Sequence, residues 1–88
     1  MDEKEIKYFT SQYLDEKMQE NSNYIRCTFY DIRIKNNLSE IETEVFLNLS
    51  KKYLENNGFS VFLTGDSYVH ENIEKNVQSN ELMIAVKY

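Results

Sequence analysis

The side chains best able to perform covalent chemistry are scarce in this sequence of 88 residues, which contains one cysteine, Cys27, and one histidine, His70. A thiol and an imidazole can act as nucleophile and base only when the two groups lie within hydrogen-bond reach. Cys27 shares one side of an alternating, strand-like run with Ile25 and Phe29, and a lone cysteine in such a place usually acts as a small buried hydrophobe. We therefore expect no catalytic residue and no enzymatic activity.

Metal and phosphate sites have equally little support. Asp66, His70 and Glu71 could offer ligands, but they have no defining spacing, and a structural zinc site usually needs several Cys or His residues. The only two glycines, Gly58 and Gly65, stand where turns are expected, so the sequence contains no glycine-rich loop to hold a phosphate. We expect no bound metal and no cofactor.

Aromatic and arginine side chains are better candidates for binding, and residues 24–35 hold both arginines of the chain. Successive side chains of a strand point to opposite faces, so the apolar set of this segment faces the core and the other set faces outward. The core-facing set changes from odd to even positions near Tyr30 and Asp31, ending with Ile32 and Ile34. This change of phase predicts a β-bulge or a sharp bend that would re-aim Arg33.

A surface formed by these outward side chains has three interpretations. Aromatic and arginine residues concentrate at protein interfaces, they also pack well across neighbouring strands, and exposed aromatics can stack on single-stranded bases. The residues that we predict to bind a partner are Tyr24, Arg26, Tyr30, Arg33 and Phe62.

Two long helices are expected, and each begins at a capping box, in which Ser or Asp is followed three residues later by Glu. The first helix should cover residues 3–20, and the second should cover residues 40–57 with Gly58 as its left-handed stop. In the second helix the expected core stripe is Ile41, Val45, Phe46, Leu49 and Tyr53. Leu47 and Leu54 lie off that stripe on a rear face, where they could contact the first helix or support self-association as a homodimer.

Strands are expected at residues 24–35, 59–64 and 81–87, and residues 67–80 are compatible with either a short helix or a loop. The predicted fold is a single α+β domain over residues 1–88, in the order α-β-α-β-(loop or short helix)-β. We expect a two-layer sandwich with a three-stranded mixed sheet, the last strand central, and both long helices on one face. The other face of the sheet would then be uncovered.

Charge and composition narrow the function classes. The net charge of −5 disfavours binding to duplex nucleic acid, and the longest apolar run is far too short to span a membrane. Residues with AT-rich codons abound, which indicates a low-GC bacterium or one of its phages or plasmids. We expect a small, acidic, cytoplasmic interaction protein that binds or inhibits a larger protein or nucleoprotein, such as a phage or mobile-element inhibitor of the anti-CRISPR or anti-restriction type. The alternative is a single-stranded nucleic-acid-binding module that uses the aromatic sheet face.

Overall fold

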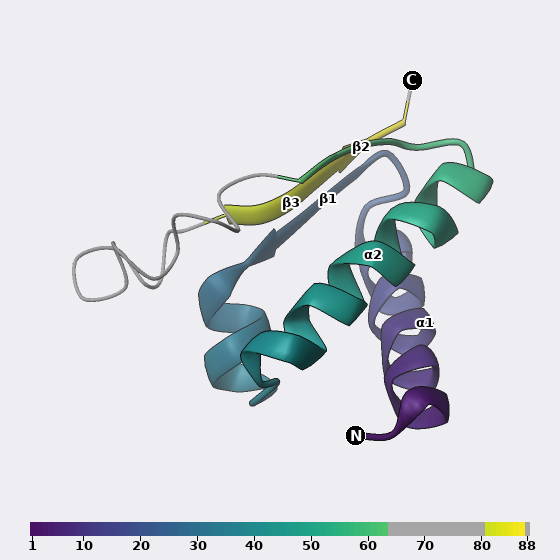
Figure 1. Ribbon diagram of the computed structural model, residues 1–88. Helices are drawn as coiled ribbons and strands as arrows, with labels where there is room; N and C mark the ends of the chain where they lie inside the picture. The colour runs from purple at the N-terminus through teal and green to yellow at the C-terminus, as the bar shows by residue number, and fades with distance from the viewer. Residues whose placement is uncertain (64–80, 88) are drawn as a thin grey trace.

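A computed structural model describes residues 1–63 and 81–87 (Figure 1). The elements in chain order are helix α1 (Glu3–Glu20), strand β1 (Tyr24–Thr28), π-helix η1 (Tyr30–Lys35), helix α2 (Glu40–Asn56), strand β2 (Ser60–Leu63) and strand β3 (Glu81–Val86). Figure 1 shows α1 and α2 on the same side of the three strands. The predicted α+β sandwich with both long helices on one face is thereby confirmed, whereas the helix or loop predicted for residues 67–80 lies outside the described residues.

Both long helices begin where the capping boxes predict. The backbone N–H of Glu5 donates to the Asp2 carboxylate at 2.9 Å, and the Glu5 carboxylate accepts from the Asp2 N–H at 3.2 Å. Ser39 and Glu42 make the same reciprocal pair of hydrogen bonds at the start of α2. These bonds pair backbone donors that a helix otherwise leaves without partners.

The end of α2 also follows its sequence signal. Gly58 has a φ of +90°, a conformation that residues with a Cβ atom rarely adopt. The backbone N–H of Gly58 donates to the Glu55 carbonyl at 3.1 Å, and the N–H of Phe59 donates to the Leu54 carbonyl at 2.9 Å. These bonds satisfy the last carbonyls of α2 and turn the chain into β2.

The sheet has the strand order β1-β3-β2, so β3 is the central strand, as expected. Both pairings are antiparallel, which makes the sheet antiparallel throughout rather than mixed. The strands β1 and β2 run in the same direction but do not touch, because β3 lies between them. Across the sheet Ile84 is opposite Arg26 on one side and Phe62 on the other.

The strand predicted over residues 24–35 is wrong in its second half, because β1 ends at Thr28 and the chain then forms η1. Cys27 is opposite Met83 and Thr28 is opposite Glu81, so Leu82 is an extra residue on β3. The irregularity therefore lies at the end of β1 and bulges the partner strand. Ile32 is fully buried, as expected, but Ile34 is 52% exposed and is not a core residue.

The buried face of α2 also differs from the predicted stripe. Leu47 and Leu54 are buried in the core, and Ile41, which was expected in the core, is 74% exposed. The helix packs against α1, β2, β3 and η1, and its Phe46 ring lies 5.8 Å from the Phe9 ring of α1. Leu47 and Leu54, predicted to lie off the core stripe on a rear face, are thus core residues, and buried side chains present no surface for self-association.

Candidate functional site

The candidate site is the face of the sheet that points away from α1 and α2. The strand register places Tyr24, Val86 and Ser60 in one row across this face, and Arg26, Ile84 and Phe62 in the next row. We call the surface formed by Tyr24, Arg26, Phe62, Ile84 and Val86 the open sheet face. Phe62 is 54% exposed and Tyr24 is 43% exposed, while Ile84 and Val86 are half-buried between them. Each strand contributes at least one large apolar side chain to this surface.

An ion pair crosses the open sheet face from β1 to β3. The Nε of Arg26 donates to the Glu81 carboxylate at 2.9 Å, and both side chains are partly exposed. Exposed ion pairs of this kind contribute only about 0–1 kcal/mol to stability because water screens them. The pair does offset the guanidinium charge, so the open sheet face is mainly aromatic and aliphatic rather than cationic.

The structure places three of the five predicted binding residues together. Tyr24, Arg26 and Phe62 share the open sheet face, as the alternation along each strand predicts. Tyr30 is 41% exposed but begins η1, so it lies outside the regular alternation of β1. Arg33 also belongs to η1, where its Nε donates to the Leu38 carbonyl at 3.1 Å and its guanidinium lies 5.1 Å from the centre of the Phe29 ring. These contacts give Arg33 a structural role.

Sequence reasoning missed Ile84 and Val86 as members of this surface. Residues 82–86 are all apolar, so their pattern does not show which side chains face the helices. The register decides the matter, because Ile84 is opposite Arg26 and Val86 is opposite Tyr24. Two aliphatic side chains thus fill the middle of a surface whose edges are aromatic.

A partly buried polar cluster that joins α1 to η1 was also missed. The Tyr13 hydroxyl donates to the Asp31 carboxylate, and the Lys17 ammonium lies 4.0 Å from the same carboxylate. Burial, with the neighbouring Cys27 and Asp31, raises the pKa of Tyr13, and burial raises the pKa of the Cys27 thiol to about 12. Both groups are therefore neutral near pH 7, whereas the thiolate is the form of cysteine that acts as a nucleophile.

The remaining candidates for chemistry can be placed only in part. His70, Asp66 and Glu71 lie outside the described residues, so the predicted alternatives that involve them stay predictions. Within residues 1–63 and 81–87, no three His, Cys, Asp or Glu side chains are grouped so that they could hold a metal ion. In the same part of the chain, neither helix has the length and apolar character required to cross a bilayer.

Comparisons of the chain with protein-family models, with curated proteins and with solved structures gave no match. A functional assignment must therefore rest on the geometry and chemistry of the surfaces described above.

Proposed function

We propose that this protein is a non-enzymatic interaction protein that binds a larger protein through the open sheet face. The observation that carries the proposal is the row formed by Arg26, Ile84 and Phe62 across all three strands. The row combines an exposed aromatic ring, an aliphatic centre and a guanidinium held by Glu81. Aromatic and arginine side chains are the types that most often dominate the binding energy of protein interfaces.

The shape of this surface suits a protein partner. A sheet held by helices on its other side keeps its backbone fixed, so few side chains lose freedom when a partner binds, which lowers the entropic cost of association. A small protein that covers part of a larger one can inhibit it by occlusion. An inhibitor encoded by a phage or mobile element, as expected from size and acidity, would act in this way.

The second candidate is a protein that binds single-stranded nucleic acid. Its support is the exposure of two aromatic rings, Tyr24 and Phe62, on the same face, on strands that lie two spacings or about 10 Å apart. Two features weigh against it. The Arg26 charge is offset by Glu81, and the net charge of −5 repels a phosphate backbone.

Quantitative affinity capture from the cells that contain the protein tests the first candidate. The wild-type chain should retain a specific protein that Phe62→Ala retains at least tenfold less well. Tyr8→Ala is the matched control. Tyr8 is 68% exposed on α1, so its substitution removes an aromatic ring from another surface. Equal capture by the wild type and Phe62→Ala would contradict the proposal.

Fluorescence anisotropy with labelled single-stranded DNA and RNA tests the second candidate. Micromolar or tighter affinity that falls with added salt and is weakened by Phe62→Ala or Tyr24→Ala would favour nucleic acid over a protein partner. We expect no such binding.

A further inference from the structure

Helix α2 has apolar side chains on two different faces. One face is buried and includes Phe46, Leu47 and Leu54. The second is a stripe in which residues recur every four positions, formed by Ile41, Val45, Leu49 and Tyr53. Ile41 is 74% exposed and Val45 is 38% exposed, while Leu49 and Tyr53 are half-buried against α1. Packing against the core explains Leu49 and Tyr53, but a surface helix that only covers a core does not need the exposed Ile41 and Val45 to be apolar.

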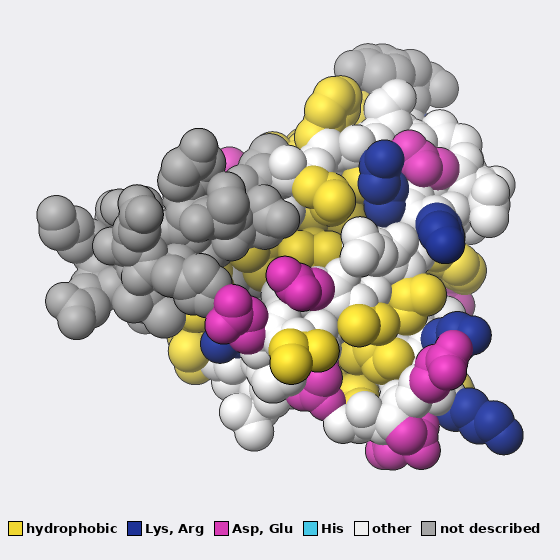
Figure 2. All heavy atoms as spheres, viewed as in Figure 1, with side chains coloured by type: hydrophobic (Ala, Val, Ile, Leu, Met, Phe, Trp, Pro, Cys, Tyr) yellow, Lys and Arg dark blue, Asp and Glu magenta, His cyan; other side chains and the backbone are white. Residues whose placement is uncertain are grey.

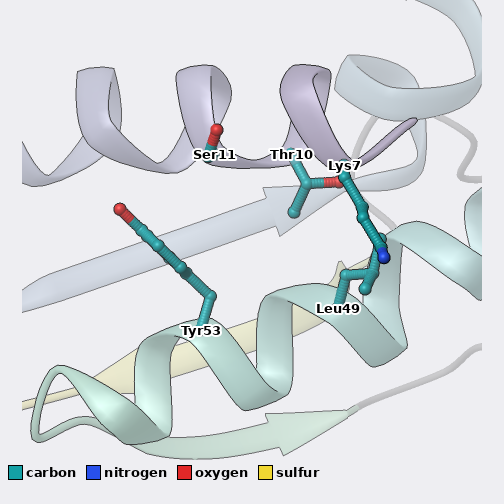
Figure 3. A pocket seen from close by; sticks show the side chains of 5 residues that line it. All are labelled: Lys7, Thr10, Ser11, Leu49 and Tyr53. Atoms are coloured by element: carbon teal, nitrogen blue, oxygen red, sulfur yellow. The ribbon is translucent and has the colours of Figure 1, made fainter. Parts of the chain in front are cut away.

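The stripe forms one wall of a groove between α1 and α2, and two cavities mark the course of this groove. The first cavity, of about 180 Å³, lies between the start of α1 and the Ile41–Val45 turn of α2. The second, of about 170 Å³, is lined by Lys7, Thr10 and Ser11 of α1 and by Leu49 and Tyr53 of α2 (Figure 3). Successive turns of both helices line the two cavities in the same order, so the cavities follow one another along the seam between α1 and α2, which we call the interhelical groove.

Side chains of both helices extend into the interhelical groove, and a hydrogen bond closes one of its ends. In Figure 3, Tyr53 and Leu49 project from α2 toward α1, and Lys7 extends from α1 toward Leu49. The Tyr53 hydroxyl donates to the Asp15 carboxylate at 2.7 Å and ties the two helices together beyond the second cavity. Figure 2 shows hydrophobic side chains gathered over this side of the molecule, with both acidic and basic side chains around them.

The charges beside the groove are mostly negative. Asp2, Glu3 and Glu42 line the first cavity together with Met1, whose terminal amino group pairs with Glu42. Lys7 in the second cavity is paired with Glu3 at 3.4 Å, so the three carboxylates still outnumber the two cationic groups. Hydrogen bonds from the terminal amino group and from Ser39 lower the pKa of Glu42 to about 2, so its carboxylate is charged at neutral pH. Helices α1 and α2 each contain two more acidic than basic residues. A basic partner therefore gains both hydrophobic and electrostatic complementarity.

We propose that the interhelical groove binds an amphipathic helix of a partner protein, one whose apolar face is edged by lysine or arginine residues. The spacing of Ile41, Val45 and Leu49 presents apolar side chains once per turn, as the facing side of a bound helix requires. The basic edges of that helix would lie beside Asp2, Glu3 and Glu42. This surface is on the opposite side of the molecule from the open sheet face, so the inference does not depend on the function proposed above.

A pair of synthetic peptides tests this proposal. Both are labelled helices of about five turns with leucine along one face, and they differ only in carrying lysine or glutamate at the edges of that face. Fluorescence anisotropy should show that the lysine peptide binds the full chain at least tenfold more tightly than the glutamate peptide. Added salt should weaken binding of the lysine peptide, because it screens the attraction to the acidic groove.

Neutral substitutions separate the groove from other surfaces. The double variant Ile41→Ser with Val45→Ser should weaken binding of the lysine peptide at least tenfold, whereas the matched control Phe62→Ser on the open sheet face should leave it unchanged. Both target positions are exposed, so the variant should keep the circular dichroism spectrum of the wild type. A lysine peptide that does not bind, or that binds the double variant as well as the wild type, would overturn the proposal.

A second copy of the chain is the competing occupant. Sedimentation of the wild type and the double variant decides between a partner helix and a second copy of the chain as the occupant. A wild-type dimer that becomes monomeric in the double variant would overturn the proposal in favour of self-association, and a wild-type monomer at high micromolar concentration would support it.

Discussion

The hydroxyl group of Tyr13 on α1 donates a hydrogen bond to the carboxylate of Asp31 on η1. Asp31 also holds the π-helix locally, since its N–H donates to the Thr28 hydroxyl and its carbonyl accepts two hydrogen bonds from Asn36. The Tyr13–Asp31 contact thus joins the first helix to the point where the chain leaves the sheet. Four predictions follow from this contact and from the core around it.

Tyr13→Phe should destabilise the protein by about 1.5–3 kcal/mol, because it removes a donor from a partly buried carboxylate. Urea unfolding followed by circular dichroism measures the change. Tyr8→Phe is the control, since Tyr8 is largely exposed on the same helix, and it should change stability by less than about 0.5 kcal/mol. A loss no larger for Tyr13→Phe than for Tyr8→Phe would show that the Tyr13–Asp31 hydrogen bond does not stabilise the fold.

Cys27 should resist alkylation in the folded protein. Its side chain is fully buried, and its pKa of about 12 leaves almost no thiolate at pH 8. Iodoacetamide at pH 8 should therefore label Cys27 at least a hundredfold more slowly in buffer than in concentrated urea, as followed by mass spectrometry. Rapid labelling in buffer would contradict the burial of Cys27 in the core.

The free energy of unfolding should fall at alkaline pH. The ordinary pKa of cysteine is 9.0, and its folded-state value of about 12 is higher, so the contribution of neutral Cys27 is fully present below pH 9 and is lost as the pH rises toward 12. In this window the unfolded state releases a proton that the folded state retains, which costs about 1.4 kcal/mol per pH unit. The raised pKa of Tyr13 adds a loss of the same sign above pH 10.

Urea unfolding at pH 8, 10 and 11 measures this alkaline loss. The variant Cys27→Ala should be less stable at pH 8 because of the missing sulfur, but its stability should fall less steeply between pH 8 and 10. A slope that is identical in the wild type and in Cys27→Ala would show that Cys27 does not cause the loss.

Leu54→Ala should destabilise the protein by about 2–5 kcal/mol, the usual cost of removing a fully buried leucine side chain. Ile41→Ala should change stability by less than about 1 kcal/mol, because Ile41 is 74% exposed. The two variants truncate large aliphatic residues of the same helix, so each is a control for the other. The reverse order of effects would favour the stripe predicted from the sequence over the buried face of α2.

The structure confirms the features predicted from the sequence where interactions between nearby residues decide them. The two capping boxes and Gly58 set three of the four ends of the long helices, because each acts through hydrogen bonds or φ angles within a few residues. The outward set Tyr24, Arg26 and Phe62 was also predictable, since alternation along a strand depends only on residues two apart. The part of the candidate site that lies on β1 and β2 was therefore accessible without a structure.

The rest of the site depends on the register between strands. Ile84 and Val86 belong to it because of their pairing with Arg26 and Tyr24, and an unbroken apolar segment contains no sign of that pairing. The contacts of Arg33 with Leu38 and Phe29 could not be predicted from the sequence, since they exist only after η1 has formed.

By itself, the sequence determined three of the four ends of the long helices, a last strand apolar enough to be central, and one face of β1 that carries aromatic and arginine residues. Only the tertiary structure decided that β1 ends at Thr28 and which face of α2 is buried. The first depends on pairing with β3, more than fifty residues later in the chain, and the second on contacts with the sheet, α1 and η1. Helix α2 is apolar on two faces, so its own residues could not choose between them, and the choice left Ile41 and Val45 at the surface.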